Sequence, residues 1–200
     1  MLIRMVVLGV ILAGFLRAQA VLEPPMGMKW GDSPEHLIEW ANRHQLDVRI
    51  DIPGKQPELR KIRVSPAEAR LPETEAKAIE ARYLRGRLIE FTQHFGIPGQ
   101  TTDEVTAEFE KNRKDLATRH GRFIANQQDR SVTEQFATRT RAYHREPVRG
   151  LFLLIAFTEV EDLLRKSKEA SFSIIYRNDN LRLRIEAEPQ APPPDLPAGP

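Results

Sequence analysis

Cysteine is missing from all 200 residues of the chain. Its absence excludes thiol catalysis, thiolate metal sites and disulfide bonds. Small exported domains often depend on disulfides, so this chain must be stabilised by apolar burial instead. A hydrophobic content of 40% is enough to build a core, and the length suits one domain or two small ones packed together.

The chain also lacks an excess of charge of either sign. The first 20 residues hold two of the 30 basic residues, Arg4 and Arg17, and none of the 28 acidic ones. Residues 21–200 therefore carry no net formal charge. Nucleic-acid binding draws most of its affinity from phosphate neutralisation and needs a basic excess. We expect no nucleic-acid partner.

Metal and phosphate motifs are missing as well. The sequence contains no His-Glu-x-x-His pair, no Asp-rich calcium loop and no glycine-rich phosphate loop. His36 and His44 lie eight residues apart, two helical turns from each other, which is too far to share an ion. We expect no metal site and no cofactor.

One block invites a catalytic interpretation. Residues 31–33 read Gly-Asp-Ser, and GDS-type esterases place a nucleophilic serine in such a block. A serine nucleophile needs a histidine base within hydrogen-bond reach. These esterases usually supply it from an Asp-x-x-His motif, and none of the five histidines has Asp three residues before it. Because Pro34 follows at once, Ser33 is predicted to be a helix N-cap, and a small serine hydrolase stays an alternative.

The N-terminus has the three parts of a secretory signal peptide. Arg4 precedes an apolar run over residues 5–16, and residues 18–20 read Ala-Gln-Ala, a small-x-small cleavage site. The run is shorter than the roughly 20 residues that a spanning helix needs. We predict cleavage after Ala20, a periplasmic or extracellular address, and no transmembrane anchor after cleavage.

The C-terminus, residues 188–200, contains six of the 15 prolines. Such a run is expected to form an extended, disordered tail. Between the two ends, helices are predicted over residues 34–44 and 102–120. Ser33 begins the first, whereas Thr101 and Glu104 have the spacing of a capping box before the second. Gly121 is predicted to end the second helix.

Strand patterns follow each helix. They cover residues 59–64, 81–84, 87–95, 136–143, 151–157, 171–177 and 181–187. Arg85-Gly86 and residues 178–180 are predicted hairpin turns, and residues 160–168 a short helix. The sequence thus predicts an α+β fold with two helices packed on antiparallel sheet. The order of elements suggests two related halves, residues 28–98 and 99–187.

Residues 30–35, Trp-Gly-Asp-Ser-Pro-Glu, resemble the W-G-x-S-x-E helix start of many small exported bacterial proteins. Residues 83–91 resemble the hairpin of the same proteins, and residues 102–121 lie where their second helix ends in glycine. These proteins look like tandem α-β repeats of the β-lactamase-inhibitor-like kind. The resemblance covers about residues 30–121 and implies an envelope-associated binding or assembly role without catalytic residues.

A basic row on one predicted strand is the candidate ligand site. Arg139, Arg141, Tyr143 and Arg145 alternate along it, so their side chains share one face. Arginine suits bidentate contacts with carboxylate or phosphate. The partner would be an anionic envelope component or another exported protein. The alternative is a solvated face paired with Glu90, Glu134 and Glu146.

The sequence therefore predicts an exported, non-catalytic binding or assembly module of the bacterial cell envelope. An inhibitor of an exported enzyme is a third candidate beside the hydrolase. An open sheet face would favour binding or inhibition, and a pocket joining Ser33 to a histidine would favour the enzyme. Apolar residues from both halves are expected in the core: Trp30, Leu37, Trp40, Ile89, Phe91, Val105, Phe109, Leu116, Leu153, Ile155 and Ile174.

Overall fold

A computed structural model describes residues 22–54, 56–66 and 70–189, which form an α+β fold with an antiparallel sheet, as expected. The helices are α1 (Pro34–Arg43), α2 (Thr102–His120) and α3 (Asp179–Ala187). The strands are β1 (Asp47–Asp51), β2 (Leu59–Ser65), β3 (Ala78–Leu84), β4 (Arg87–Phe95), β5 (Ile124–Val132), β6 (Phe136–Val148), β7 (Leu151–Asp162) and β8 (Ser167–Asn178). The predicted signal peptide lies outside the described residues, as does residue 190 onward of the predicted tail.

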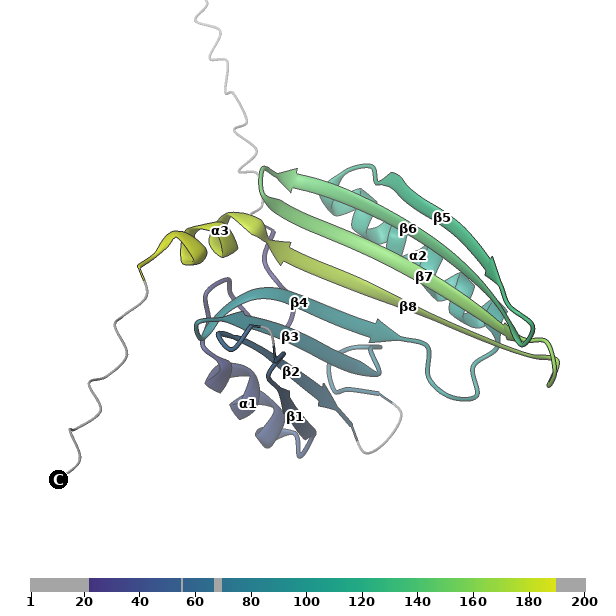
Figure 1. The fold of residues 1–200 in the computed structure, drawn as a ribbon, viewed down its shortest axis with the longest axis horizontal. Helices are drawn as coiled ribbons and strands as arrows, with labels where there is room; N and C mark the ends of the chain where they lie inside the picture. Colours follow the sequence, from purple (N-terminus) through teal and green to yellow (C-terminus); the bar gives the residue numbers. More distant parts are fainter. Residues whose placement is uncertain (1–21, 55, 67–69, 190–200) are drawn as a thin grey trace, which may run out of the picture.

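All eight strands belong to one open sheet of order β1-β2-β3-β4-β8-β7-β6-β5 (Figure 1). Each of α1 and α2 is followed by four strands that pair in sequence. The two groups of strands meet where β4 pairs with β8, with Phe91 opposite Tyr176 and Phe95 opposite Phe172. Phe95 and Phe172 also stack, with their ring centroids 4.4 Å apart.

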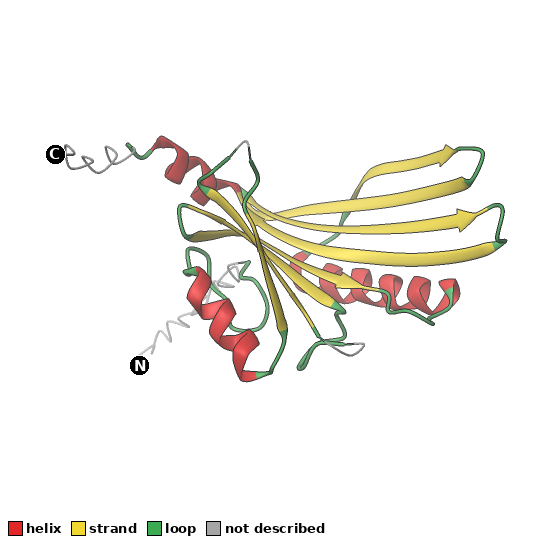
Figure 2. Cartoon of the chain, turned by 60° about the horizontal axis from the view of Figure 1, so that its bottom comes forward, coloured by secondary structure: helices red, strands yellow, loops and turns green. Residues whose placement is uncertain are grey.

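The core lies between the sheet and two of the helices. Figure 2 shows α1 and α2 on the same side of the sheet. Both contribute to a single cluster of buried side chains, which includes Leu37 and Trp40 from α1 and Phe109 from α2. Every core residue expected from the sequence is buried except Trp30. Trp30 is half-buried, and its indole N–H donates to the Leu22 carbonyl at 2.5 Å.

The segment before α1 is held against the sheet by backbone hydrogen bonds. The Gly31 N–H donates to the Leu88 carbonyl at 3.0 Å, and the Leu88 N–H donates to the Asp32 carbonyl at 2.9 Å. The predicted Arg85-Gly86 turn is confirmed, since both residues have positive φ, 48° and 73°. This geometry matches the right-handed twist of a tight hairpin.

Three predictions near the C-terminus were wrong, and one of them is the hairpin turn at residues 178–180, where β8 ends and α3 begins. Residues 160–168 form no helix, because β7 and β8 continue to Asp162 and from Ser167 and join through a short turn. Residues 181–187 belong to α3 rather than to a strand. The Asn178 side chain caps that helix at the Leu181 N–H, and Arg182 forms ion pairs at helical spacing with Asp179 and Glu186.

Neither edge strand was predicted from the sequence. β1 is short and has no fully buried side chain. β5 reads Ile-Ala-Asn-Gln-Gln-Asp-Arg-Ser-Val and carries no apolar alternation. Both strands form through pairing with a neighbour rather than through burial of one face.

Candidate functional site

The register of the strands separates a covered face from an uncovered one. On β7 and β8, Phe157 and Phe172 are buried toward α2, whose Phe109 ring lies 5.2 Å and 5.8 Å from theirs. Their neighbours in the chain point to the opposite face. α3 borders that face at one end, and no other helix of the described residues packs on it (Figures 1 and 2). We call it the uncovered face.

The middle of the uncovered face carries an apolar row. It consists of partly exposed side chains from β7 and β8: Phe152, Leu154, Ala156 and Ile175. Leu154 and Ile175 lie opposite each other in the register. Apolar side chains on a solvated sheet face are unusual, because antiparallel sheets normally alternate apolar inside and polar outside.

Beside the apolar row lies a basic group formed by Lys61, Arg63, Arg82 and Arg177. Lys61, Arg63 and Arg82 surround Glu80, at 3.6, 4.0 and 3.9 Å, and Arg82 also contacts Glu90 at 3.3 Å. The side chains of Glu80 and Glu90 are more buried, at 16% and 17% exposed, whereas those of the four cations are 33–45% exposed. The surface offered to a partner is therefore positive.

Arg177 joins the basic group to the apolar row, since its guanidinium carbon lies 5.1 Å from the Phe152 ring centroid. Glu90 lies opposite Arg177 in the register. Burial raises the pKa of the Glu90 carboxyl, and the nearby Arg82 and Arg177 oppose this rise only in part. The Glu90 carboxyl thus releases its proton less readily than an exposed glutamate does.

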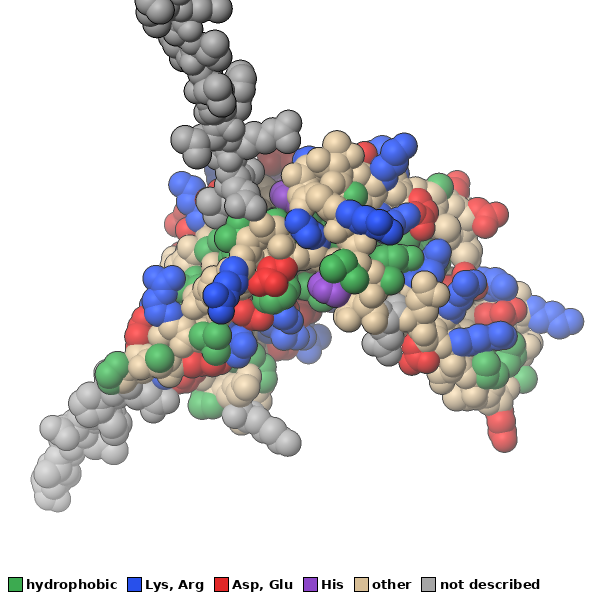
Figure 3. Space-filling model, turned by 90° about the horizontal axis from the view of Figure 1, so that it is seen from above, with side chains coloured by type: hydrophobic (Ala, Val, Ile, Leu, Met, Phe, Trp, Pro, Cys, Tyr) green, Lys and Arg blue, Asp and Glu red, His purple; other side chains and the backbone are tan. Residues whose placement is uncertain are grey.

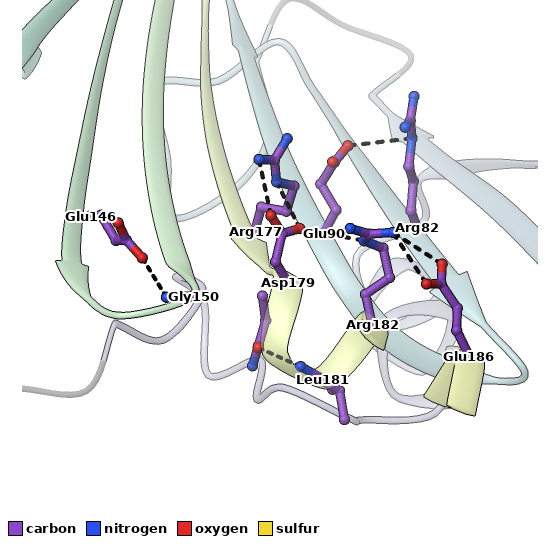
Figure 4. A network of polar contacts seen from close by, with 10 residues as sticks. Arg82, Glu90, Glu146, Gly150, Arg177, Asp179, Leu181, Arg182 and Glu186 are labelled. Atoms are coloured by element: carbon purple, nitrogen blue, oxygen red, sulfur yellow. Dashed lines mark hydrogen bonds and ion pairs between the residues drawn. The ribbon is translucent and has the colours of Figure 1, made fainter. Parts of the chain in front are cut away.

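A hollow of about 690 Å³ opens where α3 meets the basic group. Figure 4 shows its charged side chains pairing across elements. Arg177 contacts Asp179 at 3.1 Å, and Arg182 contacts Asp179 at 3.4 Å and Glu186 at 3.0 Å. The pairing fixes these side chains at one end of the uncovered face and makes the hollow polar.

A histidine and a serine meet near the centre of the same face. His94 Nδ1 lies 2.9 Å from Ser173 Oγ across the β4–β8 pairing, and His94 Nε2 is buried without a partner in the described residues. A catalytic triad needs a carboxylate bonded to that second nitrogen, and the described residues place none there. Burial lowers the pKa of His94, and the nearby cations Arg63, Lys77 and Lys61 lower it further.

The lowered pKa of His94 makes stability depend on pH. The unfolded chain binds a proton near the ordinary histidine pKa of about 6.5, whereas folded His94 stays neutral to lower pH. Stability should therefore be complete above that value and decline as the pH falls below it. We expect His94→Gln to flatten the decline between about pH 7 and pH 5, measured by urea unfolding. Burial also lowers the pKa of His120, so His120→Gln should likewise flatten the decline and provides the comparison for His94→Gln. A decline of the same slope in His94→Gln as in wild type would contradict this assignment.

Ser33 occupies the N-cap position of α1, but its side chain makes no hydrogen bond to the helix backbone. The prediction that it caps the amides was wrong in that respect. Its hydroxyl instead bonds the Glu35 carboxylate and lowers the pKa of that group. No histidine side chain of the described residues bonds the Ser33 hydroxyl. The His36 N–H donates to the Ser33 carbonyl at 3.3 Å, and His36 Nδ1 lies 2.9 Å from Asp32 Oδ2. Thr101, in contrast, forms the predicted capping box with Glu104.

The two caps give a paired prediction. Thr101→Ala should lower the free energy of unfolding by about 1 kcal/mol, because it removes the acceptor for the Glu104 N–H. Ser33→Ala should change it by less than about 0.5 kcal/mol, because no amide loses a partner. Urea unfolding of both variants measures the difference, and an equal loss for both would contradict it.

The predicted basic row does share one face, and that face is the covered one. Arg141 lies over the Phe157 and Phe109 rings, at 4.5 Å and 5.3 Å, and within 3.7 Å of Glu110. Arg145 donates to the His120 carbonyl at 3.1 Å. Tyr143 lies under Arg113 at 5.1 Å. Arg139 alone of the four is exposed. The ion-pair partner of Arg141 is Glu110, which is not one of the glutamates expected from the sequence. Ligand binding by the basic row stays a prediction.

These contacts predict unequal effects within the row. Arg141→Gln should lower the free energy of unfolding by about 1–2 kcal/mol, because it removes the contacts with two rings and Glu110. Arg139→Gln, a control on the same strand, should stay within about 0.5 kcal/mol of wild type. Thermal or urea unfolding compares the two. Equal stability would mean that Arg141 is only a solvated cation.

No helix of the described residues is long and apolar enough to cross a membrane. No group of three or more histidine, aspartate or glutamate side chains is arranged among these residues to hold a metal ion.

Comparison with known proteins gives no relative. No protein-family model matches the chain, and no curated protein and no solved structure matches it significantly.

Sequence reasoning missed the uncovered face as a candidate site. One signal was present in the sequence: residues 151–157 are almost continuously apolar, whereas a half-solvated strand should alternate. The basic group carried no such signal, because its members come from three strands, β2, β3 and β8, that the pairing with β4 brings together.

Proposed function

We propose that this protein is an exported, non-catalytic binding module of the bacterial cell envelope, and that its uncovered face docks another exported protein. One observation carries the proposal. The apolar row of Phe152, Leu154, Ala156 and Ile175 is partly exposed beside a basic group on the same face. Protein interfaces combine an apolar centre with a polar rim in this way, and arginine is enriched in them.

A protein partner fits this surface better than a small ligand. Small molecules bind in concave pockets that bury most of their surface. The apolar row lies on an open sheet, and the hollow beside α3 is lined mainly by paired charges. Since Lys61, Arg63, Arg82 and Arg177 project beyond Glu80 and Glu90, the complementary surface is acidic around an apolar patch.

The export part of the proposal rests on the N-terminal sequence. Leu22, the second residue after the predicted cleavage site, is fully buried, and its carbonyl accepts the Trp30 indole N–H. Packing of the described chain therefore begins beside the proposed mature N-terminus. N-terminal sequencing of exported protein should give Val21 as the first residue, and an intact Met1 on membrane-bound protein would contradict cleavage after Ala20.

We also propose that residues 28–98 and 99–187 are related halves. Each contains a helix followed by four consecutively paired strands, and the halves join through their last strands. The resemblance to β-lactamase-inhibitor-like repeats agrees with this arrangement. An inhibitor of an exported enzyme is then one form of the same function, with the enzyme as the docked protein.

The hydrolase alternative draws little support from Ser33, whose hydroxyl bonds Glu35 rather than a histidine. A fluorophosphonate probe tests it directly. We expect no covalent labelling of Ser33 or of Ser173. Labelling of either serine that is lost on its replacement by alanine would favour the hydrolase.

Charge reversal on the uncovered face tests the docking proposal. The double variant Lys61→Glu with Arg63→Glu should reduce the yield of adducts on chemical cross-linking of intact cells by about tenfold or more, because repulsion replaces attraction. Lys111→Glu with Lys114→Glu makes the same change of charge on the outer side of α2, where both residues are exposed. This control should keep the adducts. Equal loss in the two double variants, or no loss in either, would contradict docking at the uncovered face.

A further inference from the structure

Two hairpin turns form a projecting tip at one end of the sheet. The first joins β5 to β6 and the second joins β7 to β8. They lie side by side, because the Leu163 N–H donates to the Gln135 carbonyl at 2.8 Å. Figure 1 shows them at the right-hand end of the long strands β6, β7 and β8, away from α3. We call residues 132–136 and 162–168 the hairpin tip.

The hairpin tip exposes four large apolar side chains. Leu164 is 73% exposed, Val132 60%, Leu163 40% and Phe136 39%. Hairpin turns usually hold Gly, Asn, Asp or Ser, because these residues satisfy turn geometry and prefer water. Consecutive leucines at the end of a turn gain nothing from that position in water. Their placement indicates a surface that is buried in another medium.

Several backbone N–H groups of the hairpin tip form hydrogen bonds within their own turn. The Thr133 N–H donates to the Phe136 carbonyl at 2.8 Å, and the Phe136 N–H donates to Thr133 Oγ1 at 3.0 Å. The Leu164 and Arg165 N–H groups both donate to Asp162 Oδ1, at 3.0 Å and 2.9 Å. Unpaired backbone groups are costly in hydrocarbon. These internal bonds reduce that cost for both turns.

Cations surround the leucines. Arg165, Lys166 and Lys168 follow Leu164 within four residues, and the side chains of Arg165 and Lys168 are 83% and 50% exposed. Asp162 is only 13% exposed and already accepts two backbone N–H groups. Glu134 supplies an exposed negative charge on the other turn, and an exposed Glu169 follows Lys168. Lys168 pairs with Glu161 at 3.5 Å and with Glu159 at 4.0 Å, which leaves Arg165 and Lys166 as the exposed cations next to the leucines. Figure 3 shows hydrophobic side chains at the right-hand end, with Lys and Arg and also Asp and Glu around them.

We propose that the hairpin tip inserts shallowly into the interface of a bilayer that contains anionic phospholipids. The leucines and Phe136 enter the boundary between headgroups and acyl chains, while Arg165 and Lys166 remain among the lipid phosphates. A convex projection suits a lipid surface, whereas the broad uncovered face suits a protein. The tip would tether the module to a membrane without occupying the uncovered face.

The absence of native cysteine allows a local test on the full chain. A polarity-sensitive fluorophore on Leu164→Cys should show a blue shift and at least about twofold higher emission with vesicles containing phosphatidylglycerol. It should respond little to pure phosphatidylcholine vesicles or to soluble glycerol phosphate. The same label on Arg49→Cys, a residue with a 77% exposed side chain on β1, should not respond. Because the readout is local, binding through the apolar N-terminal segment cannot imitate it.

Matched leucines supply the second measurement. With the fluorophore at residue 136 through Phe136→Cys, Leu164→Asp should weaken partition into the anionic vesicles by about tenfold. Leu183→Asp, at a 55% exposed leucine of α3, should leave partition unchanged. Arg165→Glu with Lys166→Glu should abolish the preference for anionic lipid.

Three results would overturn the proposal. The first is an unresponsive label at residue 164 while the protein floats with the vesicles. The second is equal loss of partition from Leu164→Asp and Leu183→Asp. The third is a response of the label to an envelope protein fraction but to no vesicle, which would make the tip a protein contact.

Discussion

Replacing Phe109 by alanine should lower the free energy of unfolding by about 4 kcal/mol, one of the largest losses expected from a single side chain. Phe109 is fully buried at the centre of α2. Its ring lies 5.2 Å from Phe157, 5.8 Å from Phe172 and 6.1 Å from Tyr143, and it supports the Arg141 guanidinium at 5.3 Å. Truncation would leave a cavity where α2 meets β6, β7 and β8.

Urea unfolding measures this loss, with Lys111→Ala on the exposed side of the same helix as its control. The control should stay within about 0.5 kcal/mol of wild type, because its side chain is 77% exposed. If Phe109→Ala lost no more than the control, α2 would not be anchored on the sheet through this ring.

The second large effect is expected at Gly96, directly after β4 at the junction of the halves. Its φ is +90°, and an added Cβ would lie 2.7 Å from the Ala170 carbonyl oxygen and 3.0 Å from the Ser171 Cα. Both are backbone atoms that cannot move aside easily. Gly96→Ala should therefore lower the free energy of unfolding by about 3 kcal/mol or more, through strain and overlap together.

Gly99→Ala separates those two causes. Gly99 has the same φ of +90°, but an added Cβ would meet no atom within 4 Å. Its loss should reflect backbone strain alone, about 1–2 kcal/mol. Equal losses at the two glycines would show that the close approach to β8 contributes nothing.

Local signals in the sequence predicted elements well where they agreed with burial. The capping box at Thr101 and Glu104 is present, and α2 begins and ends at the predicted residues. The Arg85-Gly86 turn and the bounds of β4 also match. In each case a cap or a turn residue coincided with a strong apolar pattern.

The failures have a common physical cause, since the alternation of side chains does not identify the partner that will cover them. Leu181, Leu183 and Ile185 alternate as in a strand, yet only Ile185 is buried and Leu183 is 55% exposed. The cap from Asn178 and the ion pairs of Arg182 favour a helix instead. Residues 160–168 show the opposite error, a predicted helix that is strand and turn, because the pairing of β7 with β8 extends through Glu161 and Asp162.

The candidate site was harder to predict than the fold. Alternation correctly assigned Arg139, Arg141, Tyr143 and Arg145 to one face, but sequence alone could not tell whether α2 would cover that face. The contacts of Arg141 with Phe109 and Phe157 give the answer. The basic group on the uncovered face depends on the pairing of β2, β3 and β4 with β8, which lies more than 70 residues later in the sequence.

Site-specific photo-cross-linking in intact cells tests the central claim most directly. A photoreactive side chain would be placed at Leu154 or Thr158, both partly exposed on the uncovered face, and at Lys111 or Lys114 on the outer side of α2. The proposed docking predicts discrete protein adducts from the first pair and none from the second. Adducts from α2 with none from Leu154 or Thr158 would contradict the assignment of the uncovered face as the binding surface.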